Sequence, residues 1–323
     1  MIEGRPSVTA AWVCLMASMR WCYDDPKGLR QANLMRSISR QDMPLVFWII
    51  SQFILCNKFV TKSFIFFLEA CISINPVNFI NMRKDFMSKQ VTKFLNDNRN
   101  EKELQVIVLA AGYDLLALTL AELHPHVSFI EIDHPSTGAV KLAALRKLLN
   151  EKNSGSNSLP RNLHFCHREI GQKCTIRDAL ANSDLHVYDK GIPTAIVMEG
   201  LSYYLTEMEN IQVYNELGRH FGCVGSVVAF DFFELDKFGS PTTSKLMGSF
   251  STLASIFKHA VNSFGEPFKW GLAPENVNAF FKDTCWEPIP AKLTYNNCDE
   301  GTFESAIMMD ILFATSLKWR KKD

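Results

Sequence analysis

Residues 104–135 constrain the fold of this chain more than any other stretch of the sequence. Their first six residues are apolar and rich in β-branched side chains, which predicts a buried parallel strand. Ala110-Ala111-Gly112 then allows a tight turn and a close approach of a ligand to the backbone. A helix over about 114–123 and a second strand over 127–132 follow. This order predicts the nucleotide-binding opening of an α/β domain.

Two acidic residues stand where the second strand ends. Glu131 and Asp133 follow Gly112 by 19 and 21 residues. An acid about 20 residues beyond such a turn suits a ribose, because a carboxylate accepts hydrogen bonds from both hydroxyls. The NAD fingerprint is absent, since position 110 is not glycine and no third glycine follows Gly112. The alternative is an α/β core in which these acids are only solvated strand ends.

Composition excludes several classes of protein. The formal net charge of the 323 residues is zero, so the chain lacks the basic footprint of a nucleic-acid-binding protein. Nine cysteines occur without a C-x-x-C pair, and His164, Cys166, His167 and Cys174 are too irregularly spaced to predict a zinc site. We therefore expect reduced thiols, a cytoplasmic protein and no metal. The sequence does not predict an oligomeric state.

The chain divides into a predicted helical cover over residues 1–100 and an α/β core over 101–323. Pro44 and Pro76 are expected to break the helices of the cover. The apolar stretch 45–74 contains charged residues, and its uncharged run of residues 43–57 is shorter than the roughly 20 residues that span a bilayer. We expect two buried helices of a soluble protein, not a membrane span. The aromatic residues of this stretch could instead wall an apolar substrate pocket.

The remaining sequence continues the alternation of helix and strand. Ser136 is a candidate N-cap for the helix that follows it. The expected elements are a helix over 137–150, a loop over 153–160, strands over 162–166 and 194–198, a helix over 207–220, a strand over 224–233, a helical insertion over about 240–283, and strands near 288–295 and 307–317. Together they predict a Rossmann-like α/β fold with a seven-stranded, mostly parallel sheet.

Several short motifs occur in an order and at spacings that belong together. They are Thr9–Val13, Asp24-Asp25-Pro26, Met82–Asp85, Leu109–Asp114, Glu131–Pro135, Glu199–Leu205, the segment 265–271 and Cys285-Trp286. With them, nearly the whole chain resembles the leucine carboxyl methyltransferase family, and within it the bacterial and polyketide-type O-methyltransferases. The resemblance implies a class I methyltransferase fold, S-adenosylmethionine as the cofactor and methyl transfer to an oxygen. The expected acceptor is a carboxylate of a small, partly apolar molecule or of a protein C-terminus.

The resemblance also implies a role for each motif residue. Arg83 would hold the methionine carboxylate, because a guanidinium gives two parallel charged hydrogen bonds. The turn formed by Ala110, Gly112 and Asp114 would lie under the methionine and ribose. The other candidates are Asp133 or its competitor Glu131 for the ribose, His167 for the adenine, Glu199 for the methionine amine, and Tyr203 and Tyr204 for positioning the acceptor. Purely structural roles stay open for Arg83 as a solvated arginine, for Glu199 as a helix cap and for both tyrosines as packing residues.

Three departures from the family pattern bear on function. Ala110 stands where the family has glycine, and a left-handed backbone there would cost about 1 kcal/mol or more. Leu115-Leu116 follows Asp114 where the family has Thr-Arg, and Cys166–Glu169 replaces an Asp-Leu-Arg-Asp segment beside the adenine. Two other functions therefore stay open: a non-catalytic relative that keeps the fold as a binding or scaffold protein, and an NAD-dependent oxidoreductase.

Overall fold

The computed structural model describes residues 6–72, 76–150, 158–168, 176, 191–233, 266–289 and 312–321. Its helices are α1 (Val8–Ser18), α2 (Pro26–Ser37), α3 (Leu45–Ile54), α4 (Lys58–Ile72), α5 (Pro76–Asp97), α6 (Leu116–Leu123), α7 (Pro135–Asn150), α9 (Glu207–Phe221) and α11 (Val277–Phe281), with short 3-10 turns at Met19–Tyr23, Arg40–Asp42, Ser202–Tyr204 and Pro274–Asn276. Its strands are β1 (Gln105–Leu109), β2 (Ser128–Asp133), β3 (Leu163–His167), β4 (Thr194–Met198), β5 (Val227–Phe233), β6 (Trp286–Pro288) and β7 (Leu312–Trp319).

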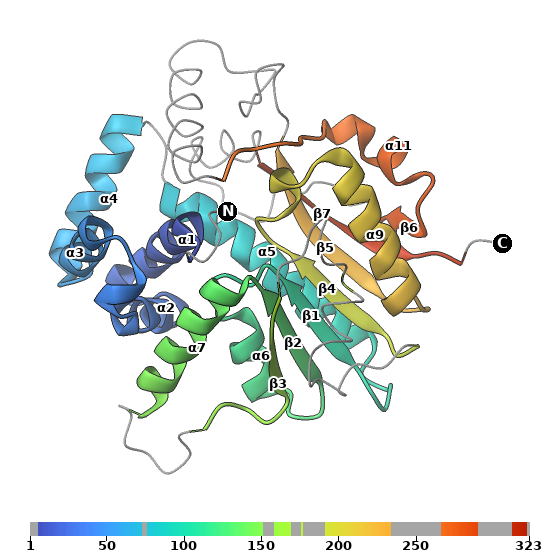
Figure 1. Ribbon diagram of the computed structural model, residues 1–323, viewed down its shortest axis with the longest axis horizontal. Helices are drawn as coiled ribbons and strands as arrows, with labels where there is room; N and C mark the ends of the chain where they lie inside the picture. The colour runs from blue at the N-terminus through green and yellow to red at the C-terminus, as the bar shows by residue number, and fades with distance from the viewer. Residues whose placement is uncertain are drawn as a thin grey trace.

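The seven strands form one sheet in the order β3-β2-β1-β4-β5-β7-β6. Strands β1 to β5 are parallel, whereas β7 runs antiparallel to both of its neighbours. Because β1 lies between β2 and β4, the chain reverses its direction of winding at β1. In an open α/β sheet the carboxyl ends of the strands at such a reversal form a crevice that binds ligands. The predicted seven-stranded, mostly parallel sheet is confirmed (Figure 1).

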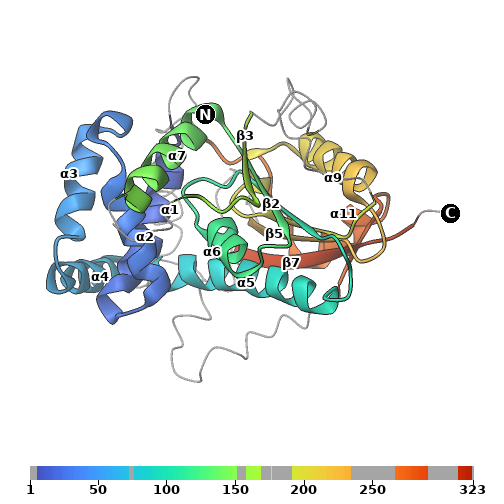
Figure 2. The same ribbon diagram turned by 90° about the horizontal axis from the view of Figure 1, so that it is seen from below.

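Helices cover both faces of the sheet. Along β1 the side chains alternate, so Val106 and Val108 join the core shared with α1, α2, α5, α6 and α7, and Ile107 and Leu109 join the core under α9 and α11. Figure 2 shows α5 and α6 on one side of the strands and α9 on the other. Strands buried on both faces require near-continuous apolar sequence, which is what made β1 and β4 recognisable.

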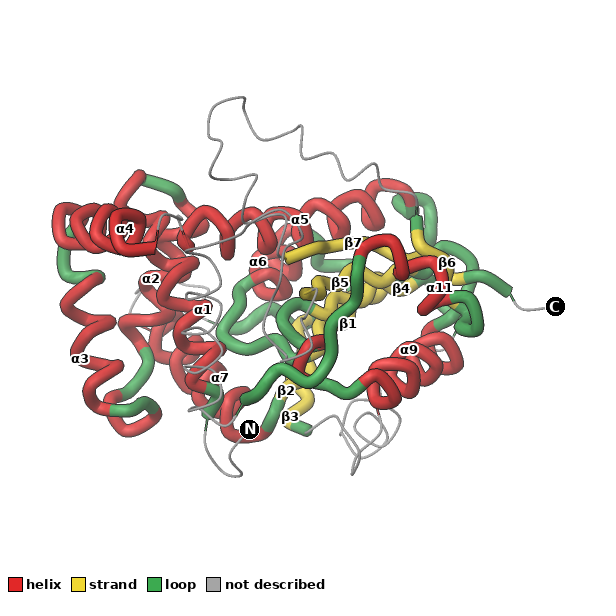
Figure 3. The backbone as a smooth tube through the Cα atoms, turned by 90° about the horizontal axis from the view of Figure 1, so that it is seen from above, coloured by secondary structure: helices red, strands yellow, loops and turns green. Residues whose placement is uncertain are grey.

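The N-terminal helices gather beside the sheet rather than on top of it (Figure 3). Pro44 and Pro76 lie at the starts of α3 and α5, as predicted. The expectation of two buried helices over 45–74 is wrong for one face of them. Eight large apolar side chains there are exposed, among them Val46, Phe59 and Phe66 at 69%, 80% and 72%. None of the described residues of this stretch lines the cavity at the sheet edge.

No single helix among the described residues is long and apolar enough to cross a bilayer. The segments Leu45–Ile54 and Lys58–Ala70 reach the required length and hydropathy only together, and they are bent by 111°.

Two predicted boundaries need correction or cannot be compared. Helix α7 begins at Pro135, not at Thr137, because a proline suits the first helical position, where an amide hydrogen bond is not needed. Ser136 therefore lies inside the first turn and is not the N-cap. The predicted insertion over 240–283 falls largely outside the described residues, which resume at 266 and are helical only from 274 to 281. Most of the loop over 153–160 and of the strand near 288–295 also falls outside the described residues. The last predicted strand, 307–317, is confirmed over its described residues, where β7 (Leu312–Trp319) lies.

Candidate functional site

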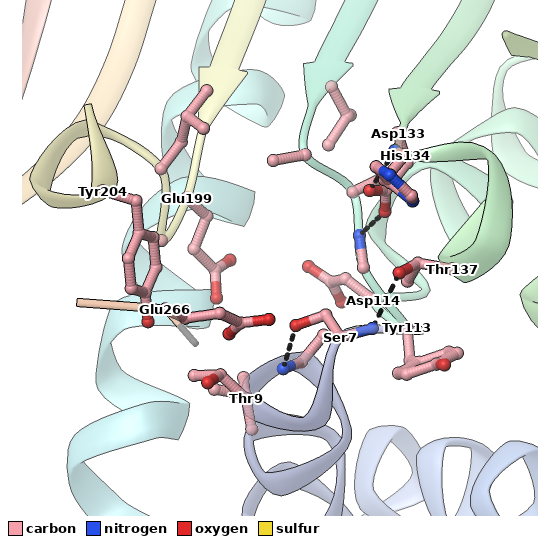
Figure 4. A pocket seen from close by; sticks show the side chains of 18 of the residues that line it. Ser7, Thr9, Tyr113, Asp114, Asp133, His134, Thr137, Glu199, Tyr204 and Glu266 are labelled. Carbon is pink, nitrogen blue, oxygen red and sulfur yellow. Dashed lines mark hydrogen bonds between the residues drawn. The ribbon is translucent and has the colours of Figure 1, made fainter. Parts of the chain in front are cut away.

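A cavity of about 570 Å³ opens at the carboxyl ends of β1, β2 and β4 (Figure 4). Its walls come from the turn after β1, the end of β2, the segment after β4, the first turns of α1, the start of α5 and residues 266–269. The volume lies within the range of small-molecule and cofactor sites. Apolar and charged groups alternate around it, and residues far apart in the sequence meet there.

The turn after β1 is left-handed at two positions. Ala110 has φ of 53° and Gly112 has φ of 51°. The Ala110 amide donates a hydrogen bond of 2.8 Å to the carbonyl of Ile132, so its conformation is fixed by the neighbouring strand. Glycine adopts this conformation freely, but the Cβ of alanine meets a carbonyl oxygen. The left-handed backbone at Ala110, which would carry the cost stated above, is therefore the one observed.

Replacing Ala110 with glycine is expected to raise the free energy of unfolding by about 1 kcal/mol, because relief of the left-handed strain exceeds the added entropy of the unfolded chain. Urea denaturation at constant slope would measure it. Ala111→Gly is the matched control, since Ala111 has a negative φ and should lose about 0.5–1 kcal/mol instead. Equal effects at the two positions would contradict the strain.

Asp133 secures this turn from the end of β2. Its Oδ2 accepts a hydrogen bond from the Gly112 amide, and its Oδ1 accepts one of 2.6 Å from the His134 amide. Asp133 also lines the cavity (Figure 4). Burial raises the pKa of its carboxyl group, and the two backbone hydrogen bonds oppose that rise. A carboxylate oriented by two amides is well placed to accept further hydrogen bonds from a ligand.

Glu131, the competing candidate, does not line the cavity. It is 3% exposed, and its Oε2 lies 2.6 Å from the Nζ of Lys141 on α7, which is equally buried. Burial raises the pKa of the Glu131 carboxyl group, and Lys141 opposes the rise. The structure thus places Glu131 in a buried ion pair beneath α7, and Asp133 is the acid that meets the cavity.

We expect Lys141→Met alone to lower the free energy of unfolding by about 3 kcal/mol or more, because it leaves Glu131 buried without its counter-charge. The double variant Glu131→Leu/Lys141→Met should recover to within about 1 kcal/mol of the parent, since an apolar pair of similar volume replaces a desolvated ion pair. Chemical denaturation of the three proteins would show this. A double variant as unstable as the single one would contradict the assignment.

Arg83 is buried and contacts several polar side chains, so it is not a solvated arginine. Its Nε and Nη2 lie 3.0 and 2.9 Å from Oε1 of Glu199. Its Nη1 lies 3.4 Å from Asp231 at the end of β5 and 3.3 Å from the Tyr203 hydroxyl. Burial raises the pKa of Asp231 to about 6, although Arg83 opposes the rise. Two acids therefore already neutralise this guanidinium. Direct binding of a ligand carboxylate by Arg83 stays a prediction.

Glu199 lines the cavity, and its two oxygens have different surroundings. Lys84 Nζ lies 3.1 Å from Oε1 of Glu199 and 3.2 Å from Oδ2 of Asp114. Oε1 of Glu199 therefore already contacts two cations, Lys84 and Arg83. Burial raises and Lys84 lowers the pKa of Asp114, and the net shift is downward. The second oxygen of Glu199, Oε2, is inaccessible to solvent and has no hydrogen-bond partner among the described residues. A buried acceptor without a donor is costly, and the role expected for Glu199 beside the methionine amine stays a prediction.

His167, the residue expected beside the adenine, does not line the cavity, whereas its neighbour Arg168 does. The His167 ring packs against Gly138 of α7, where a Cβ would come within 2.5 Å of it, and does not line the cavity. Burial lowers its pKa, so the ring is neutral near pH 7. Arg168, one residue further on, does line the cavity. A contact of either residue with an adenine stays a prediction.

Tyr203 and Tyr204 both reach the cavity wall. They pack in an aromatic cluster with Phe233 and Phe268, and the two tyrosine rings meet edge to face with their centroids 4.8 Å apart. Burial raises the pKa of both hydroxyl groups. The Tyr203 hydroxyl accepts a hydrogen bond of 3.3 Å from Nη1 of Arg83, whereas Tyr204 lies on the same side of the cavity as Glu266 (Figure 4).

Other cavity residues were not singled out as site residues from the sequence. Among them are Ser7, Thr9, Lys84, Arg168 and Glu266. Thr9 and Glu266 lie in motifs that carried the family resemblance, but nothing in those motifs indicates that both line one cavity. Cys14 also lines the cavity, and burial raises the pKa of its thiol to about 11, so it is not a ready nucleophile near pH 7.

The strand order, with an antiparallel β7 beside β5, is that of the class I methyltransferase fold. The model of the leucine carboxyl methyltransferase family matches residues 74–217, which include Arg83, the turn after β1, both acids of β2 and the segment after β4. The resemblance inferred from the motifs is thereby confirmed.

Known proteins similar to this chain were found by sequence and by structure. The Bacillus subtilis (strain 168) protein named "Putative S-adenosyl-L-methionine-dependent methyltransferase YktD" is 25% identical over 190 residues, which cover 55% of this chain and 58% of that protein. The chain thus matches less than two thirds of this relative's length. A DUF574 family protein from Streptomyces avermitilis is 12% identical and matches with a TM-score of 0.50 over 74% of this chain and 83% of its own. Magnesium protoporphyrin IX methyltransferase from Synechocystis is 11% identical, with a TM-score of 0.43 over 76% and 87%.

Proposed function

We propose that this chain is an S-adenosylmethionine-dependent methyltransferase that methylates an oxygen. The observation that carries the proposal is the placement, around one cavity, of the left-handed turn at Gly112, the oriented carboxylate of Asp133 and the unpartnered Oε2 of Glu199. They match the three parts of the cofactor that need partners nearest the reacting centre: its backbone, its ribose hydroxyls and its amine. The matched family and the Bacillus relative support the same cofactor.

The charge of the cavity suits a cationic sulfonium. Among the described lining residues the acids are Asp114, Asp133, Glu199, Glu209 and Glu266, and the bases are Arg83, Lys84, Arg168 and Lys269. Five acids and four bases leave one negative charge in excess, which favours a ligand with one extra positive charge. Burial strengthens that attraction, because buried charges are screened less by salt than exposed ones.

When bound, the cofactor supplies an electrophilic methyl group that an oxygen displaces from sulfur. The residues of this chain would contribute positioning and exclusion of water, which raise the rate by holding the reacting atoms in line. Asp133 and Glu199 would fix the cofactor from two sides, and the first turn of α1 would close the cavity opposite the sheet (Figure 4). A carboxylate acceptor, which the family resemblance favours, stays a prediction.

Calorimetric titration with S-adenosylmethionine, S-adenosylhomocysteine and NAD tests the proposal. We expect saturable heat with both adenosyl compounds and none with NAD, because the turn lacks the third glycine on which dinucleotide binding depends. Absence of heat and of a thermal shift with both adenosyl compounds at millimolar concentration would refute it.

A non-catalytic relative is the second candidate, and the strained Ala110 is the observation that favours it. Its Cβ stands in the cavity wall where the family has glycine. Such a protein would bind S-adenosylhomocysteine and yet transfer no labelled methyl group to a broad panel of small alcohols, phenols and carboxylic acids. Transfer to a member of that panel would rule it out.

A further inference from the structure

Helices α3 and α4 present an apolar surface that the proposed cofactor site does not explain. The two helices are joined by three residues, and Figures 1 and 3 both place them at the outer end of the helical cover, away from β6. The α3–α4 surface consists of their exposed large apolar side chains, which are Leu45, Val46, Ile49, Ile50 and Phe53 on α3 and Phe59, Phe66 and Phe67 on α4. None of these eight residues lines the cavity at the sheet edge.

The α3–α4 surface is large enough for a stable interface between proteins. Its four Phe side chains are 59–80% exposed. At roughly 200 Å² for each aromatic side chain, these four alone offer about 550 Å². The four aliphatic side chains bring the surface close to the roughly 800 Å² that each partner buries in a stable complex. Exposed apolar patches of this size mark sites of interaction.

Charged side chains line one flank of α4. Lys58, Lys62 and Glu69 are spaced by four and seven residues, so they share one flank of the helix, beside Phe59 and Phe66. Both lysines are exposed and Glu69 is partly exposed. The bases lie toward the start of α4 and the acid lies toward its end. An antiparallel copy of α4 would therefore bring the bases of each helix to the acid of the other.

We propose that the α3–α4 surface is a dimer interface for a second copy of this chain, with the two α4 helices antiparallel about a two-fold axis near Phe66. A two-fold interface places the same surface on both partners, so that surface has to complement itself. With the axis at this position, Lys62 of one protomer faces Glu69 of the partner subunit. The two Phe66 side chains meet at the centre, where aromatic anchors contribute most to binding. This inference does not depend on the proposed methyltransferase function.

The charges around the α3–α4 surface favour a protein partner over a lipid surface. Among residues 40–70 the bases are Arg40, Lys58 and Lys62, and the acids are Asp42 and Glu69. Lys58 is also paired with Asp24, which precedes α2. Because these groups balance to no net charge, the surface lacks the basic excess that attracts anionic lipids.

Sedimentation velocity of the full chain over a series of concentrations tests the inference. We expect a monomer–dimer equilibrium with a dissociation constant below about 10 μM, since interfaces of this size give micromolar to picomolar affinities. A chain that remains monomeric at about 100 μM, ten times that bound, overturns the inference. So does a monomeric chain that sediments with phosphatidylserine vesicles, which would identify a lipid surface as the occupant.

A substitution at the proposed axis locates the interface. We expect Phe66→Asp to weaken the dimer at least about 100-fold, because it removes two aromatic anchors and places two like charges at the centre. Met208→Asp, the same change at a similarly exposed apolar residue of α9, is the control and should leave the dissociation constant unchanged. Thermal denaturation shows whether both variants fold. A dimer that tolerates Phe66→Asp as well as the control lies on another surface, which would refute the proposal.

Reversal of two charges tests the antiparallel arrangement. Lys62→Glu and Glu69→Lys should each weaken the dimer about tenfold, because each change places like charges opposite one another twice in the dimer. The double variant should return to within about threefold of the parent, since both pairs are again of opposite charge. Lys62 also lies over the Tyr23 ring of its own protomer, 5.4 Å from the ring centre, and the double variant does not restore that contact. Recovery therefore reports contact between protomers, and a double variant no tighter than the single ones contradicts the proposed pairing.

Discussion

Replacing Arg83 with alanine is expected to lower the free energy of unfolding by about 3–5 kcal/mol, the range for removing one partner of a buried ion pair. Arg83 is the cation that faces both Glu199 and Asp231, and Asp231 is fully buried. Its loss leaves Asp231 without a charged partner, so that carboxyl group should be neutral near pH 7 in the variant. Urea denaturation of the parent and the variant would measure the difference.

Two further variants make the test of Arg83 specific. Arg83→Lys keeps the charge but not the fork that reaches three partners, so we expect an intermediate loss. Arg30→Ala removes a more exposed ion pair with Glu122 and should cost at most about 1 kcal/mol. Similar losses for Arg83→Ala and Arg30→Ala would contradict the buried network.

The second large effect concerns the cofactor. We expect Asp133→Asn to weaken binding of S-adenosylhomocysteine about 100-fold, because two charge-assisted hydrogen bonds to the ribose, together about 3 kcal/mol, are lost. Asparagine retains an oxygen for the Gly112 amide but loses the acceptor of the His134 amide, so thermal denaturation is needed to show that the variant folds. Isothermal titration provides the affinity.

The matched control for Asp133 is the double variant Glu131→Leu/Lys141→Met. It removes the neighbouring acid of the same strand, which the structure places outside the cavity. We expect its affinity for S-adenosylhomocysteine to equal that of the parent. A loss in this variant and none in Asp133→Asn would reverse the roles of the two acids.

The sheet could be predicted because its strands are buried on both faces. Continuous apolar runs mark β1 and β4, and the boundaries predicted for β4 agree with the structure. The turn after β1 could be predicted as well, since its geometry requires small residues and a downstream acid. The φ of Ala110 was not, because one alanine tolerates either conformation and only the hydrogen bond to Ile132 decides it.

The partners within the site could not be read from the sequence. Arg83 meets Glu199 at a sequence separation of 116 residues and Asp231 at a separation of 148. Nothing local to α5 indicates that its arginine is neutralised by acids at the ends of β4 and β5. Likewise, Glu131 and Asp133 lie two residues apart on the same strand, and the sequence does not tell which of them meets the cavity. The ion pair between Glu131 and Lys141 on α7 decides it. The exposed Phe residues of α3 and α4 show the converse error, because an apolar sequence does not establish burial.

A crystal structure of the protein with S-adenosylhomocysteine is the most direct measurement of the central claim. We predict that the ribose hydroxyls bind Asp133 and that the amine lies beside Glu199. A ligand bound elsewhere, or one whose ribose contacts neither Asp133 nor the Gly112 turn, would contradict it.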